Sequence, residues 1–161
     1  MIKKILLGLV IVVGLVSCKS KDAFNYSENF VKKERSLLPD ITATEDNVKK
    51  FLATGDYDSI AIAGERMEKI VDAKLKEIKD EPLPSAKEAE NFREAGIQYF
   101  LFIKSMYTGY KDYGNAKTTE DRDVEMDKLR EIVDKKTKAI EDMQAAQRKY
   151  ADANGFKLES K

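Results

Sequence analysis

The sequence predicts an all-α fold, an antiparallel up-down-up-down four-helix bundle, and three observations lead to this prediction. Four segments repeat apolar residues at alternating intervals of three and four, which places those residues on one face of a helix. Residues that cap or stop helices lie between the segments. Charged residues make up 36% of the 161-residue chain, which has only 8 Gly and 3 Pro, a composition typical of helices with solvated faces.

The first helix is predicted over residues 25–54, with Pro39 near its middle. Proline lacks the N–H that a helix uses at that position, so we expect the helix to kink or to break there. The apolar spacing continues in register across Pro39, which favours one kinked helix. The alternative is two helices, the second capped by Thr42. The apolar face consists of Phe30, Leu37, Ile41, Val48 and Phe51.

The second helix is predicted over residues 57–80. Asp56 or Asp58 is suited to cap its first turn, and Pro82 and Pro84 stop it. Lys74 lies in the apolar row, where its aliphatic stem can pack while its charge reaches water. The other residues of this row are Ile60, Ala63, Met67, Ile70 and Ile78.

The third helix is predicted over residues 86–113, opened by a capping box from Ser85 to Glu88. Its narrow apolar face consists of Phe92, Ala95, Tyr99, Phe102, Met106, Tyr110 and Tyr113. Four more apolar residues fall outside this row: Ile97, Phe100, Leu101 and Tyr107. We interpret these four as a candidate partner surface. The competing interpretation is a wide core stripe that the first helix covers.

The fourth helix is predicted over residues 119–154, opened by a capping box from Thr118 to Asp121. Its apolar row consists of Leu129, Ile132, Ala139, Met143, Ala146, Tyr150 and Ala153, with Lys136 in the same row. A glycine follows three of the periodic segments, where a left-handed residue commonly ends a helix: Gly55, Gly114 and Gly155. Because the connections are short, we expect consecutive helices to pack antiparallel.

The residue types that the chain lacks exclude several classes of function. It has no His, no Trp and one Cys, which excludes His-based catalysis, the His ligands of diiron and haem sites, and an intramolecular disulfide. Acids alternate from Asp121 to Asp127 as at the start of a calcium loop, but Met126 and Ile132 stand where that loop needs Gly and Glu. We therefore expect no metal, no cofactor and no catalytic residue.

The N-terminus carries an export signal. Lys3 and Lys4 precede an apolar stretch over residues 5–16, whose length as a helix, about 18 Å, is too short to cross a bilayer. The stretch ends in Leu15-Val16-Ser17-Cys18, which resembles the lipobox of bacterial lipoproteins. In that family the chain is cleaved just before the cysteine, which then carries the lipid. The resemblance implies cleavage between Ser17 and Cys18 and lipidation of Cys18.

These features divide the chain into a cleaved signal peptide (1–17), a lipidated flexible tether (18–24), a helical bundle domain (25–155) and a C-terminal tail (156–161). Cleavage removes two lysines and no acid, which leaves 27 basic and 29 acidic residues. This near-neutral balance argues against a nucleic-acid partner. Lysine and acid just after Cys18 resemble the export signals of Bacteroidota lipoproteins, which implies the outer membrane, on its periplasmic or cell-surface side.

Asp58-Ser59-Ile60 resembles the O-glycosylation acceptor of exported Bacteroidota proteins, which makes Ser59 a candidate modification site. The competing interpretation is that the neighbouring aspartates only cap the second helix.

The sequence thus favours a non-enzymatic lipoprotein, anchored to a membrane through its lipid, whose helical bundle binds a protein or envelope component or has a structural role. It leaves the partner and the oligomeric state open. One alternative is a bundle that binds a small molecule or glycan, with Tyr107, Tyr110 and Tyr113 lining a pocket; more often such tyrosines are the ends of a core. A second alternative is a hydrolase that uses paired carboxylates.

Overall fold

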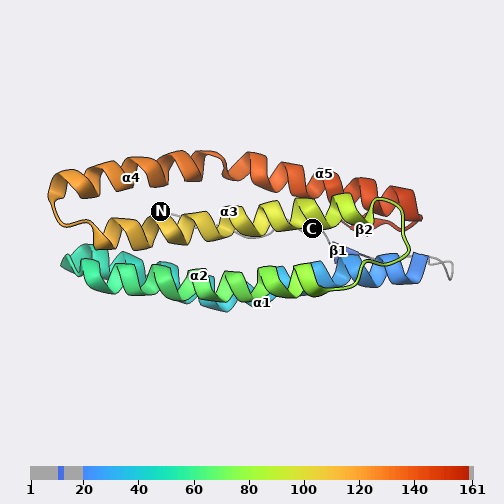
Figure 1. Ribbon diagram of the computed structural model, residues 1–161, viewed down its shortest axis with the longest axis horizontal. Helices are drawn as coiled ribbons and strands as arrows, with labels where there is room; N and C mark the ends of the chain where they lie inside the picture. The colour runs from blue at the N-terminus through green and yellow to red at the C-terminus, as the bar shows by residue number, and fades with distance from the viewer. Residues whose placement is uncertain (1–10, 13–19, 160–161) are drawn as a thin grey trace.

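The computed structural model describes residues 11–12 and 20–159, and it confirms the all-α class. Its helices are α1 (Ser20–Thr54), α2 (Tyr57–Asp80), α3 (Ala89–Asn115), α4 (Thr119–Asp134) and α5 (Lys136–Asn154) (Figure 1). Two short strands, β1 (Ile11–Val12) and β2 (Leu158–Glu159), pair antiparallel. The lipobox residues Leu15, Val16, Ser17 and Cys18 lie outside the described residues.

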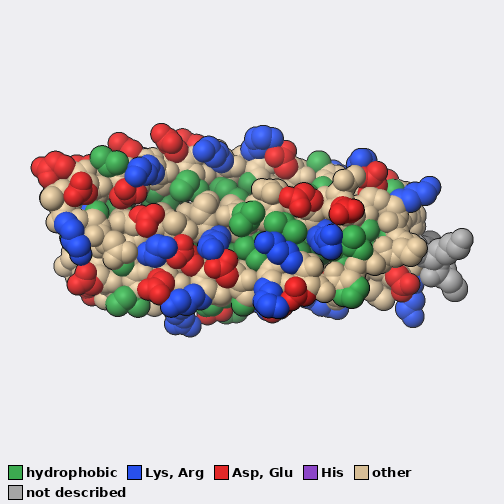
Figure 2. All heavy atoms as spheres, viewed as in Figure 1, with side chains coloured by type: hydrophobic (Ala, Val, Ile, Leu, Met, Phe, Trp, Pro, Cys, Tyr) green, Lys and Arg blue, Asp and Glu red, His purple; other side chains and the backbone are tan. Residues whose placement is uncertain are grey.

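The helices lie side by side along one long axis (Figure 1). The central helix is α3, which packs against α2, α4 and α5, while α1 packs against α2 and α5. Hydrogen bonds from Tyr99 to Glu34 and from Tyr110 to Glu45 join α1 and α3 in the same order along both helices, so these two helices run parallel. These contacts are compatible with an antiparallel order of consecutive helices. The face seen in Figure 2 mixes acidic and basic side chains along its length.

The beginning of α1 differs from its prediction. The helix begins at Ser20, so residues 20–24, which we expected in a flexible tether, are helical. Ala23 is fully buried, and the ring of Phe24 meets the ring of Phe156 edge-on at 6.0 Å. Phe156, expected in a free C-terminal tail, is itself buried. Both ends of the helical domain are therefore packed together.

Pro39 lies inside α1, which continues through it as one helix. The two-helix alternative, in which Thr42 caps the second helix, is therefore wrong. Leu37 and Ile41, on either side of the proline, are buried. Burial of their side chains offsets the backbone hydrogen bond that Pro39 cannot donate.

Glycines bring the backbones of α2 and α3 together. A Cβ atom added at Gly64 would lie 2.6 Å from the backbone N of Lys111 and the backbone O of Tyr107. A Cβ atom at Gly114 would lie 2.4 Å from the backbone N of Ala61. Gly114 therefore serves a close contact inside α3, and its predicted role as a helix-ending residue is wrong.

Other predicted helix ends are confirmed. Gly55 and Gly155 have left-handed φ angles of 70° and 71° directly after α1 and α5. The Thr118 hydroxyl accepts a hydrogen bond from the backbone N–H of Asp121 at 3.0 Å, as predicted for the cap of α4.

The start of α3 differs from its prediction. The helix begins at Ala89, and the preceding Glu88 has a left-handed φ of 60° and makes no side-chain cap. The capping box from Ser85 to Glu88 is therefore wrong. The carboxylate of Glu88 instead accepts one hydrogen bond from Asn91 at 2.6 Å and pairs with Lys149 at 2.9 Å, which ties the start of α3 to α5.

The predicted fourth helix is divided at Lys135, although neither Pro nor Gly stands there. Within α4, Leu129 alone is fully buried, because α4 packs mainly on α3. The helix that follows, α5, buries Met143, Gln147, Tyr150 and Ala151. Ala153 was predicted in the core but is exposed. At this end of α5 the buried residues are Tyr150 and Ala151.

Candidate functional site

The candidate partner surface on α3 is largely internal. Phe100 and Tyr107 are 0% exposed, so they belong to the core, and their assignment to a partner surface is wrong. Ile97 is half-buried, and Leu101 is 39% exposed. The reason is the central place of α3, because a helix with neighbours on three sides buries more than one narrow face.

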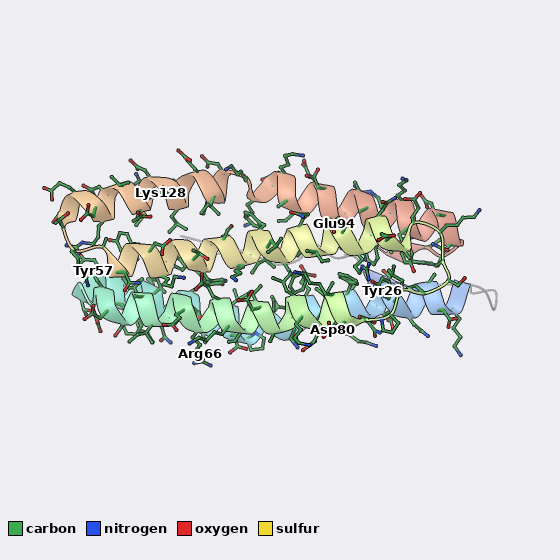
Figure 3. All side chains as sticks on the ribbon, in the orientation of Figure 1. Tyr26, Tyr57, Arg66, Asp80, Glu94 and Lys128 are labelled. Atoms are coloured by element: carbon green, nitrogen blue, oxygen red, sulfur yellow. The ribbon has the colours of Figure 1, made fainter. Side chains whose placement is uncertain are left out.

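The tyrosines near the C-terminal end of α3 pack inside the protein instead of lining an open pocket. Tyr110 donates a hydrogen bond to Oε2 of Glu45 at 3.0 Å. The ring of Tyr113 meets the ring of Tyr57 edge-on at 5.8 Å, at the end of the molecule opposite Tyr26 (Figure 3). The guanidinium of Arg122 lies 4.1 Å from the centre of the Tyr57 ring. These contacts favour the interpretation of the tyrosines as the end of a core.

Two carboxylate–tyrosine pairs, which we call the carboxylate–tyrosine ladder, join α1 to α3; Glu45 is half-buried, and the other three residues are buried. In the first, the Tyr99 hydroxyl donates to Oε1 of Glu34 at 2.7 Å, and both residues are buried. The second pair is Tyr110 and Glu45. The pairs are 11 residues apart on both helices, a spacing of three helical turns that repeats the same face.

Burial changes the proton affinity of the ladder. It raises the pKa of Glu45, because the charged carboxylate loses hydration. Burial, followed by the charge of Glu34, raises the pKa of Tyr99. Burial and the charge of Glu45 do the same for Tyr107 and Tyr110. The phenols therefore remain protonated at physiological pH and serve as hydrogen-bond donors.

The two carboxylates of the ladder are farther apart than the paired carboxylates of a glycosidase. Glu34 and Glu45 are 11 residues apart on one helix, which is about 16 Å. Paired catalytic carboxylates of glycosidases lie roughly 5–10 Å apart. Each carboxylate faces a phenol across the α1–α3 contact, where a buried polar pair can specify the register of two helices.

The ladder was not predicted, although the sequence holds a signal for it. Glu34 follows Phe30 by four residues, and Glu45 follows Ile41 by four, so both acids lie on the predicted apolar face of α1. An acid on such a face is expected to find a buried donor.

A shallow hollow of about 190 Å³ lies on the surface between α1 and α2. Ile62, at its rim, is 67% exposed although it is a large apolar residue. Arg66 also lines it and points away from the bundle (Figure 3). The remaining lining residues are Thr44, Asn47, Phe51, Ser59 and Ala63. This hollow combines exposed apolar surface with polar groups, as interaction surfaces do.

Ser59 lies in the first turn of α2 and is half-buried in this hollow. Its backbone N–H donates to Oδ1 of Asp56 at 3.2 Å. Asp56 therefore caps α2, and it is one of the two aspartates predicted for this role. The cap does not depend on whether Ser59 is modified.

Within residues 20–159, no group of three or more acidic side chains is arranged to hold a metal ion. The five described helices include none that is long and apolar enough to cross a membrane. Comparisons of the chain with protein-family models, curated proteins and solved structures found no match.

Proposed function

We propose that this chain is a membrane-anchored bacterial lipoprotein whose helical domain is a non-enzymatic binding or structural module of the cell envelope. The observation that carries the proposal is the run Leu15-Val16-Ser17-Cys18, which places the only cysteine of the chain at the end of an export signal. Cleavage before Cys18 would remove β1 and leave all five helices whole.

In this proposal the helical domain is an up-down-up-down bundle in which α4 and α5 together form the fourth leg. The parallel course of α1 and α3 in the carboxylate–tyrosine ladder supports this topology. Glu34 and Glu45 lie about 16 Å apart along α1, and each accepts a hydrogen bond from a tyrosine, which supports a structural role in preference to hydrolysis.

The surface that best supports partner binding is the hollow between α1 and α2, around Ile62 and Arg66. Its partner would be a protein or another component of the envelope. We place the lipoprotein in the outer membrane, on its periplasmic or cell-surface side, because Lys19, Lys21 and Asp22 follow the cysteine. Ser59 is the proposed glycosylation site, and a glycan there would lie at the edge of this surface.

The test is the intact mass of the protein extracted from its own membranes, compared with the variant Cys18→Ala. We expect a chain that begins at Cys18 and carries the mass of its acyl chains, together with any glycan on Ser59. Cys18→Ala should remain an unprocessed precursor or become soluble, whereas the control Ser17→Ala keeps a small residue before the cysteine and should be processed. A Cys18→Ala protein that is trimmed normally and stays in the membrane would overturn the proposal.

A further inference from the structure

The helical domain begins almost directly at the proposed lipid. Ser20 is the first residue of α1, and only one residue separates it from Cys18. Two residues of fully extended chain span at most about 7 Å. If Cys18 carries the lipid, the N-terminal end of α1 is therefore held within about one nanometre of the membrane surface.

This end of the molecule, which we call the proximal end, is packed as one unit. The ring of Tyr26 in α1 meets the ring of Tyr150 in α5 at 6.3 Å. Phe24 contacts Phe156 just beyond α5. The side chain of Asn154 bonds both the backbone N–H and the backbone carbonyl of Lys87, before α3, at 3.2 and 2.9 Å. A rotation of α1 at the membrane must therefore move the whole bundle.

We propose that the proximal end is a membrane-contacting surface, with the bundle axis directed away from the lipid, an inference that rests on the proposed lipid anchor at Cys18. The partner is a phospholipid surface. Lys21 and Lys157 are exposed at this end, together with Asp22 and Asp152, and the two lysines can pair with lipid phosphates. Phe24 is half-buried, and its ring contacts Phe156, which precedes Lys157.

The composition of the long side seen in Figure 2 argues against a bundle that lies flat on that side. A helix that lies in a membrane interface has one apolar face and a basic polar face. The side seen in Figure 2 instead mixes acids and bases along its length. Ion pairs within single helices, such as Lys69 with Glu65 in α2 and Lys138 with Asp142 in α5, likewise leave charges of both signs exposed.

An upright bundle presents the α1–α2 hollow far from the lipid. The helix α1 has 35 residues, a length of about 52 Å. The hollow residues on α1, from Thr44 to Phe51, lie 24 to 31 residues beyond Ser20. At 1.5 Å per residue the hollow stands roughly 40 Å above the proximal end. The anchor would thus act as the base of a rigid stalk.

The experiment measures energy transfer from the lipidated protein to an acceptor on lipid headgroups in phospholipid vesicles. Lipidation blocks the sulfur of Cys18, so one added cysteine can be labelled alone. Asn25→Cys reports on the proximal end and Thr54→Cys on the far end of the same helix, and both positions are exposed. With a Förster distance shorter than α1, we expect several-fold more transfer from position 25.

A matched control inserts ten Gly and Ser residues between Lys19 and Ser20. Such a linker has an end-to-end distance of about 17 Å, so the ratio of transfer between positions 25 and 54 should fall clearly. Equal transfer from the two positions without the linker, on protein whose mass includes the lipid, would overturn the upright orientation while the anchor stands. A mass without acyl chains would overturn both proposals.

Discussion

Two helices, α2 and α4, pack against the same central helix in different ways. The interface of α2 with α3 contains Gly64 and Gly114, at which the backbones nearly touch, and α2 buries seven of its residues. The interface of α4 rests on the one fully buried side chain of Leu129, which reaches Gly109 of α3. Both helices are amphipathic in sequence, so periodicity reveals which face is buried but not how closely the backbones approach.

The largest expected effect comes from Gly64→Ala, which should lower the free energy of unfolding by about 3 kcal/mol. The added methyl group would meet backbone atoms of Lys111 and Tyr107 at 2.6 Å, and these can move only with the whole of α3. Urea unfolding followed by far-ultraviolet circular dichroism measures the change.

The matched control is Gly109→Ala, at the α3–α4 interface. Its methyl group would meet Cδ1 of Leu129 at 2.8 Å, on a side chain that can turn away. The higher helix propensity of alanine also stabilises α3 by up to about 1 kcal/mol, which offsets part of any loss. We expect the control to stay within about 1 kcal/mol of the native protein. Equal losses at the two positions would contradict the distinction between a backbone interface and a side-chain interface.

The next effect separates a buried hydroxyl that has a partner from one that has none. Tyr99→Phe removes the donor that Glu34 accepts at 2.7 Å, and we expect a loss of about 2 kcal/mol, as for hydrogen bonds to charged groups. Tyr150→Phe is the control, because its hydroxyl is buried without a hydrogen-bond partner among the described residues. Its removal should be neutral or stabilising in the same urea titration. A costly Tyr150→Phe would mean that an unseen group binds that hydroxyl.

A smaller effect is expected where α4 meets the start of α2. Arg122 covers the ring of Tyr57 at 4.1 Å and donates to the carbonyl of Ala116 at 2.8 Å. We expect Arg122→Ala to cost about 1 kcal/mol. Arg130→Ala is the control, since its pair with Asp127 is exposed on both sides and should contribute close to nothing. Hydrogen exchange of α4 amides would then accelerate in the first variant only.

The elements that the sequence predicted well are those that depend on a repeating pattern. Apolar spacing located α2 and α3 to within a few residues, but α1 begins at Ser20 instead of residue 25 and the predicted fourth helix is divided at Lys135. Local chemistry at Thr118 and Gly155 located two of the helix ends. Gly114 was misassigned because a glycine after a periodic segment can end a helix or admit a neighbouring backbone, and only the tertiary structure separates these roles.

The site was less predictable, because burial depends on how many neighbours a helix has. Phe100 and Tyr107 fall outside the narrow apolar row of α3, and only the central position of that helix explains why they are buried. Glu34 and Glu45 were not predicted as buried residues, although their place four residues after Phe30 and Ile41 indicates burial. The tyrosines that pair with these acids lie on a distant segment of the chain, so the spacing of residues along one helix does not identify them.

The smallest expected effect is on the pH dependence of folding stability. Whether stability falls or rises with pH distinguishes a carboxylate of the ladder from a carboxylate in an interhelical ion pair. Burial raises the pKa of Glu45 above its ordinary 4.5, so the folded state holds this proton more tightly than the unfolded state does. Glu45 therefore contributes less stability as the pH rises through the raised pKa. Glu45→Gln should be more stable than the native protein at neutral pH, and this gain should vanish below the ordinary pKa.

Glu68→Gln provides a control of opposite sign at the α2–α3 interface. Burial opposes the shift, but hydrogen bonds from Lys111 and Thr108 lower the pKa of Glu68, so its stabilising effect is present at neutral pH and is lost on acidification through that pKa. This variant should be less stable than the native protein at neutral pH, with the deficit closing in acid. Thermal unfolding of the three proteins between about pH 2 and 7 measures both differences, because the deficit of Glu68→Gln closes only below the ordinary carboxyl pKa. If both variants lose stability at neutral pH, the charged carboxylate of Glu45 stabilises the fold, which would contradict a pKa of Glu45 raised by burial.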